Sequence, residues 1–129
     1  MNQNVKYRFV FDEAIGILYK YYYGDITIDD IRTSWIDAFE KDLIPSGTKG
    51  FILDYRQAKM NITPDEHIEI ANFYKQNLQF FGRYRFAILT DNPRDMVIPL
   101  LVQEKDEGYE SQPFSTKEAA IDWVLKKNF

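Results

Sequence analysis

The chain has 129 residues, and 45% of them are apolar or aromatic, including ten phenylalanines, nine tyrosines and two tryptophans. A chain of this length and composition can bury a single large core, so we expect one domain over residues 1–129 and no intrinsic disorder. The sixteen basic and twenty acidic residues give a net charge of -4. They are interspersed along the chain, and nucleic-acid binding needs clustered basic residues, so we expect no nucleic-acid partner.

The chain has no cysteine. This excludes disulfide bonds, thiolate-ligated metals and thiol nucleophiles. The first residues lack the apolar stretch of a signal peptide, and no later stretch approaches the roughly 20 apolar residues that a membrane-spanning helix requires. We therefore expect a cytoplasmic protein with no membrane span.

The first elements form a predicted hairpin followed by a helix. Residues 5–11 alternate between apolar and polar side chains, which is typical of a strand with one buried face, and residues 15–23 form a second strand after a tight turn. Thr27 and Asp30 resemble a capping box at the start of a helix, whose apolar stripe extends to Leu43.

Two short apolar runs without alternation, residues 50–54 and 85–90, predict central strands covered on both faces. Between them, Thr63-Pro64 begins a predicted helix whose apolar side chains continue to Phe81. A third helix is predicted from Asn92, with a kink or a delayed start because of Pro99.

The end of the chain predicts a short strand at residues 113–114 and a capped amphipathic helix from Ser115. The resulting order is β-β-α-β-α-β-α-β-α. This order of elements and the sequence of residues 114–124 resemble those of the SpoIIAA-like branch of the STAS superfamily. The branch comprises small STAS-like or SEC14-like α/β domains. The resemblance implies an α/β fold with a single-layer mixed, mostly parallel five-stranded sheet, an N-terminal β-hairpin and four helices.

The resemblance also implies a non-catalytic, regulatory role in protein binding. Anti-sigma-factor antagonists are the best understood members of the family that this sequence resembles. In those proteins, an Asp-Ser-Ser-Gly-like motif places a phosphorylatable hydroxyl at the start of a helix. This sequence departs from that motif, since it has Asn61-Ile62-Thr63-Pro64-Asp65. A phosphate on Thr63 would be favoured by the helix dipole and repelled by Asp65 and Glu66. The alternative is that the Thr63 hydroxyl serves only as a helix cap.

Ligands of open α/β sheets bind beyond the carboxyl ends of the strands, so the polar residues expected there are candidates for a site. They are Asp25, Asp54, Tyr55, Arg56, Thr90, Asp91 and Tyr109. Asp25, Asp54 and Asp91 could together hold a metal ion for an enzyme. Alternatively, Asp25 and Asp91 cap helices, and Asp54 pairs with Arg56.

Our leading hypothesis is therefore a non-catalytic interaction domain that binds a regulatory protein through Thr63 and the adjacent loop. The second is a module for a small apolar or anionic ligand, bound near Asp54, Tyr55, Arg56 and Tyr109. The third is a metal-dependent enzyme that uses the three aspartates, although we assign no metal, cofactor or catalytic residue. The aromatic run Tyr19–Tyr23 is either covered core or an exposed platform, and it suggests a homodimer.

Overall fold

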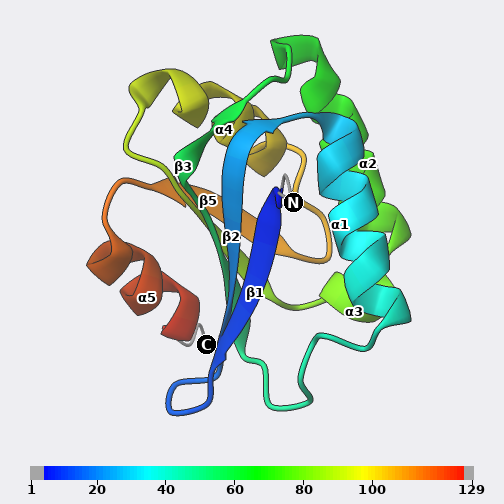
Figure 1. The fold of residues 1–129 in the computed structure, drawn as a ribbon, viewed down its shortest axis with the longest axis vertical. Helices are drawn as coiled ribbons and strands as arrows, with labels where there is room; N and C mark the ends of the chain where they lie inside the picture. Colours follow the sequence, from blue (N-terminus) through cyan, green and yellow to red (C-terminus); the bar gives the residue numbers. More distant parts are fainter. Residues whose placement is uncertain (1–4, 127–129) are drawn as a thin grey trace.

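The structure is a computed structural model that describes residues 5–126 as one five-stranded sheet flanked by helices (Figure 1). The strands lie side by side in chain order. The first two pair antiparallel, and each later strand is parallel to its predecessor, as predicted. The strands are β1 (Tyr7–Asp12), β2 (Ile17–Ile26), β3 (Gly50–Met60), β4 (Arg85–Leu89) and β5 (Glu110–Phe114).

Helices cover both faces of the sheet, unevenly. One face carries α1 (Ile28–Glu40), α2 (His67–Gln76), α3 (Leu78–Phe81) and α4 (Val97–Gln103), and the other carries α5 (Lys117–Leu125) (Figure 1). Two 3-10 turns, η1 (Pro64–Glu66) and η2 (Pro93–Met96), precede α2 and α4. Within residues 5–126, none of the helices has the length and apolar character needed to cross a bilayer.

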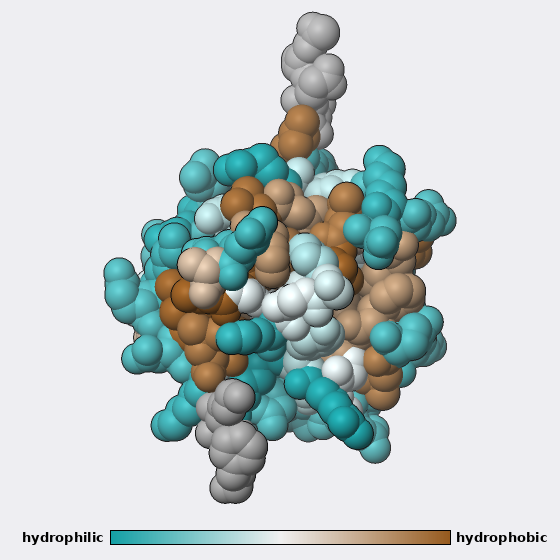
Figure 2. All heavy atoms as spheres, turned by 90° about the horizontal axis from the view of Figure 1, so that it is seen from below, coloured by the Kyte–Doolittle hydropathy of each residue, from teal (hydrophilic) through white to brown (hydrophobic). Residues whose placement is uncertain are grey.

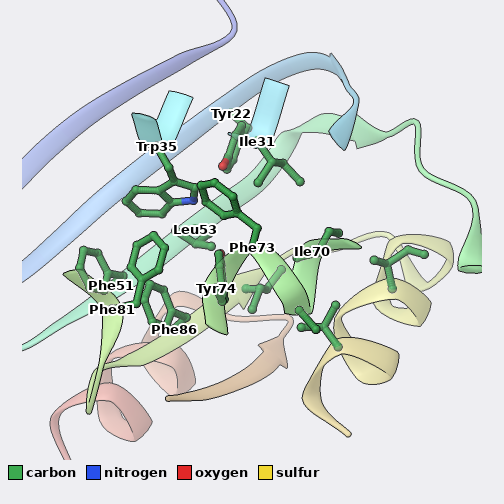
Figure 3. Packing of buried hydrophobic residues seen from close by; sticks show 14 of the residues in the cluster. Tyr22, Ile31, Trp35, Phe51, Leu53, Ile70, Phe73, Tyr74, Phe81 and Phe86 are labelled. Carbon is green, nitrogen blue, oxygen red and sulfur yellow. The ribbon is translucent and has the colours of Figure 1, made fainter. Parts of the chain in front are cut away.

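The larger core lies between the sheet and α1–α4 and is rich in aromatic rings (Figure 3). The fully buried Trp35 of α1 is at its centre, with its ring centroid 5.6 Å from that of Phe51 and 5.0 Å from that of Phe81. A smaller cluster beneath α5 includes Ile52 and Val124. Adjacent residues of β3 therefore bury side chains on opposite faces, which explains why this strand has no polar alternation.

The start of α1 has the predicted capping box. The Asp30 amide donates to the Thr27 hydroxyl at 3.2 Å, and the Thr27 amide donates to the Asp30 carboxylate at 2.9 Å. Each bond satisfies a backbone donor that has no partner within the helix.

The single helix predicted from Thr63 to Phe81 is wrong in its continuity. The structure divides it into η1, α2 and α3, with a break at Asn77, whose side-chain amide donates to the Phe73 carbonyl at 2.7 Å. The described residues therefore contain five α-helices, of which the short α3 is the one that this break adds. The delayed start predicted around Pro99 is confirmed, because Pro99 is the third residue of α4, where the missing amide would have no partner in the helix.

Candidate functional site

A polar hollow of about 410 Å³ lies just beyond the carboxyl end of β4, beside the middle of β2 and β3. It brings together three of the predicted site residues, Asp54, Arg56 and Asp91. Tyr21, Tyr22, Tyr23 and Gln57 complete its lining. Open α/β sheets usually bind ligands beyond the carboxyl ends of their strands, and the hollow meets this description for β4 alone, because β2 and β3 continue past it to Ile26 and Met60.

An irregularity in the pairing of β2 with β3 shapes this hollow. Tyr21 is opposite Asp54, but Tyr23 is opposite Gln57, so β3 has one residue more than β2 over this stretch. Such a bulge bends the strand and redirects side chains. Arg56 lies in the extra stretch and is 40% exposed, whereas Asp54 is 5% exposed.

Asp54 and Arg56 form a tight ion pair. The Arg56 guanidinium donates from Nε to Oδ1 at 3.1 Å and from Nη2 to Oδ2 at 2.8 Å, and the Arg56 amide donates to Oδ1 at 2.9 Å. The carboxylate of Asp54 also raises the pKa of Arg56. This pairing confirms the structural alternative for Asp54, because its oxygens are already occupied by donors.

The three aspartates do not converge on one point. Asp54 of β3 is opposite Tyr21 of β2, and Asp25 lies four residues further along β2. Asp25 and Asp54 are therefore separated by roughly 13 Å along the sheet. No group of three or more acidic or histidine side chains within residues 5–126 is arranged to hold a metal ion. The three aspartates of the third hypothesis therefore do not form a shared metal site among the described residues.

The predicted helix-capping role of Asp91 is also wrong. Asn92, the next residue, accepts a hydrogen bond from the Arg94 amide at 3.1 Å and caps η2. Asp91 itself is exposed at the rim of the hollow. Thr90 is buried, and its hydroxyl accepts from the Asn92 amide at 3.3 Å.

Tyr55 and Tyr109 lie outside this hollow, contrary to the sequence-based grouping. Tyr55 points to the opposite face of the sheet, where its ring stacks on Tyr22 with centroids 4.4 Å apart. Tyr109 immediately precedes β5 and so lies at the amino end of the parallel strands, against Tyr74 and Phe86. Both side chains are buried, and burial raises the pKa of each phenol. Their role is in the core.

Thr63 lies at the start of η1, where it is exposed. Its amide donates to Glu66 Oε1 at 2.8 Å, so the local hydrogen bonds are those of a helix start. His67, the one histidine in the sequence, contacts the Pro64 carbonyl through Nδ1 at 2.6 Å.

An apolar crevice lies close to Thr63, between the sheet, α2 and α4. Its lining includes Met60 at the end of β3, Ile62 from the following loop, Ile70 from α2, and Ile98 and Pro99 from α4. The free volume is about 30 Å³, which is room for about one water molecule. In this conformation the crevice is therefore too small for a drug-sized ligand.

A buried lysine is the feature that sequence analysis missed. Lys20 of β2 has no exposed surface, and its amine lies 3.9 Å from the Trp35 ring centroid and 4.7 Å from that of Tyr22. The amine donates to the Ser34 hydroxyl, and burial lowers the pKa of Lys20 well below its ordinary value. Strand periodicity could have indicated this, since Lys20 shares a face with the core residues Leu18 and Tyr22.

The aromatic run of β2 is largely covered. Tyr19 and Tyr22 are buried on opposite faces, and Tyr21 and Tyr23 are half-buried. Tyr21 stacks on Tyr19 at 5.8 Å, and partial burial raises its pKa, with a further contribution from the charge of Asp54. The run thus supplies both core and one wall of the polar hollow.

Comparison with solved structures identifies the fold. A crystal structure of an uncharacterised protein of the DUF3478 family from Shewanella loihica PV-4, which has a SpoIIAA-like fold, superposes with a TM-score of 0.61. The match covers 96% of this chain and 98% of that one, at 16% sequence identity. This chain has a SpoIIAA-like fold. No protein-family model matches the sequence, and no curated protein sequence matches it.

The SpoIIAA-like fold confirms the architecture implied by the resemblance. At this level of identity it carries no statement about the activity or partners of this chain. The function of this chain therefore depends on the side chains that it displays itself.

Proposed function

We propose that this SpoIIAA-like domain is a non-catalytic regulatory module that binds a partner protein. The observation that carries the proposal is a group of exposed aliphatic side chains on the helices next to Thr63. Ile68 of α2, Val97 of α4 and Leu100 of α4 are 47%, 46% and 49% exposed. Since α4 packs against both α2 and η1, we refer to these three residues and Thr63 as the α2–α4 surface.

Exposed aliphatic groups next to an apolar crevice favour a protein partner over a small molecule. A partner side chain can cover Ile68 and Leu100, whereas the crevice beneath has little free volume. The opposite end of the molecule, which carries the β1–β2 turn, has its hydrophobic side chains divided into separate groups by hydrophilic ones (Figure 2). The start of α2 is therefore the region that we assign to the partner.

The polar hollow supports the ligand alternative less well. Asp54 and Asp91 against Arg56 give its lining a net charge of -1, which disfavours an anionic ligand. Its one cation is already bound by Asp54 through three hydrogen bonds from the guanidinium. These features fit an ion pair that fixes the irregular middle of β3.

The proposal is tested by comparing proteins captured from the native cell with the original chain and with Leu100→Asp. The matched control is Ile36→Asp, because Ile36 is 43% exposed on α1, on a different helix. A partner that binds the α2–α4 surface is retained by Ile36→Asp and lost by Leu100→Asp. When that partner is purified, it should bind the original chain and Ile36→Asp with similar affinity and Leu100→Asp more weakly.

Thr63→Ala in the same assay separates a phosphorylation switch from a simple helix cap. Partner binding that changes after kinase treatment of the original chain, but not of Thr63→Ala, supports the switch. If every captured protein binds Leu100→Asp and Ile36→Asp equally well, the proposed surface is wrong. A co-purifying small molecule lost on Arg56→Ala would instead favour the ligand module.

A further inference from the structure

The two edges of the sheet differ in how they are protected from pairing. β5 contains Pro113, which has no amide proton to offer a further strand. β1 has neither proline nor glycine, and its pairing with β2 is regular over six residues. β1 lies in the foreground of Figure 1, and none of the helices within residues 5–126 crosses in front of its outer edge. An uncovered edge of this kind is a template for another strand.

Two hydrogen bonds define which backbone groups of β1 point outward. The Tyr23 amide donates to the Lys6 carbonyl at 2.9 Å, and the Gly16 amide donates to the Asp12 carbonyl at 2.8 Å, so even-numbered residues direct their polar groups toward β2. Backbone groups alternate in direction along an antiparallel strand. Tyr7, Phe9 and Phe11 therefore present their amides and carbonyls to the free edge.

The side chains of β1 are arranged symmetrically about Val10. Arg8 and Asp12 have opposite charges at equal distances on either side of it, and Phe9 and Phe11 flank it directly. Val10 is 37% exposed, and neither Arg8 nor Asp12 forms an ion pair with another residue in the described part of the chain. A second strand of the same sequence, antiparallel and centred on Val10, would place each charge opposite its complement.

We propose that β1 pairs antiparallel with β1 of a second copy of this chain, with the twofold axis at Val10. Phe9 then forms a hydrogen-bonded pair with Phe11 of the second copy, which uses the outward backbone groups. Arg8 faces Asp12 of the second copy, and the two Val10 side chains meet at the axis. Shifting the register by two residues in either direction keeps the backbone bonds but loses the Arg8–Asp12 pairing.

The interface consists of one pair of strands, so the dimer is a weak one whose population depends on concentration. It uses an edge distant in the sheet order from β4 and β5, and it does not use the α2–α4 surface. The homodimer therefore stands independently of the proposed partner protein. This dimer forms through β1 and not through β2, the strand for which the aromatic run suggested a dimer. β2 lies inside the sheet between β1 and β3, so it has no free edge.

Disulfide trapping gives the most direct test, because the chain has no cysteine of its own. Residues opposite each other in a non-hydrogen-bonded antiparallel pair have Cα atoms about 4.5 Å apart, within the range of about 4.4–6.8 Å that a disulfide spans. Val10→Cys should therefore form a disulfide-linked dimer under mild oxidation. Val97→Cys is the matched control, since Val97 is 46% exposed on α4.

We expect Val10→Cys to cross-link at least tenfold faster than Val97→Cys, at concentrations where sedimentation detects the reversible dimer of the original chain. Denaturant should abolish the difference, because it removes the pairing of the strands. Equal rates for the two variants in the folded state, or an original chain that stays monomeric at all accessible concentrations, would overturn the proposal.

A charge exchange tests the register. Arg8→Asp and Asp12→Arg each place like charges opposite each other at two symmetric positions, so each should weaken the dimer by about tenfold. The double variant restores complementary charges and should recover dimerisation. Arg94→Asp, on η2, controls for the change in net charge.

Asp12 Oδ1 also accepts from the Ala14 amide at 3.0 Å, so Asp12→Arg loses a bond in the β1–β2 turn. The double variant has the same loss, which makes its recovery specific to the dimer. If the double variant dimerises no better than either single variant, the proposed pairing is wrong.

Discussion

Replacing Lys20 by methionine should stabilise the protein at mildly alkaline pH. The amine is fully buried among Trp35, Tyr22 and Phe9, and it is hydrogen bonded to Ser34. Burial lowers its pKa well below that of an unfolded lysine, so at pH values between the two the unfolded chain binds a proton that the folded chain releases. Folding must therefore remove this proton from the lysine, which opposes folding wherever the unfolded lysine is charged.

The magnitude follows from the ordinary lysine pKa of about 10.4. At pH 8, keeping the amine neutral in the folded chain costs about 3 kcal/mol, since each pH unit below the unfolded pKa contributes about 1.4 kcal/mol, and this neutral amine is the premise of the prediction. Methionine has a similar length and removes this cost, but it also loses the bond to Ser34, a loss of about 1 kcal/mol. We expect Lys20→Met to raise the free energy of unfolding by about 2 kcal/mol at pH 8.

The difference between variant and original chain should depend on pH in a defined direction. Because the folded-state pKa is lowered, the stability of the original chain rises with pH up to the pKa of the unfolded lysine. Between pH 8 and pH 9.5 the advantage of Lys20→Met should therefore shrink by about 2 kcal/mol. Urea unfolding at both pH values measures it, and Lys59→Met is the control, because Lys59 is exposed.

Comparing variant with original chain cancels the contribution of the tyrosines, which also titrate at high pH. Two results would refute the reasoning. One is a Lys20→Met protein that is less stable than the original at pH 8. The other is an advantage that does not change with pH, which would mean that Lys20 stays protonated in the core, stabilised by the aromatic rings.

Two further substitutions test the packing of the sheet. A side chain at Gly50 would collide with Val124 of α5 and approach the carbonyl of the adjacent β4, so Gly50→Ala should lower the free energy of unfolding by about 1–3 kcal/mol. Adding Val124→Ala should make the effect of Gly50→Ala smaller, and a thermal-melting double-mutant cycle without such coupling would contradict the close contact. Arg56→Ala leaves the buried Asp54 carboxylate without its cation and should cost about 1–2 kcal/mol in urea unfolding. In an Asp54→Asn background the same change should cost less than half as much, and an equal cost in both backgrounds would show that the ion pair contributes nothing.

The sequence by itself determined the elements whose signals lie within a few residues. Thr27 and Asp30 marked a helix start because their side chains bond to backbone groups three residues away. Pro99 marked a delayed helix for a similar local reason. The apolar run beginning at Gly50 indicated a strand covered on both faces, and the structure has helices there on both sides.

Only the tertiary structure decided where side chains from different elements meet. The sequence-based prediction placed Tyr109 at the same end of the sheet as Asp54. Because β5 starts at Glu110, Tyr109 lies at the other end. The bulge opposite Tyr23 depends on the register between two strands, and the break at Asn77 also depends on the packing around it.

Lys20 shows the physical reason for this division. Its alternation with Leu18 and Tyr22 indicated an inward direction, which is a local property of any strand. That the inward space is filled by Trp35 from α1 and by Phe9 from β1 is a property of the assembled layers. Hydrogen bonding between near neighbours and side-chain periodicity can be predicted from sequence, whereas the environment of a side chain depends on contacts between distant residues, and these exist only in the folded chain.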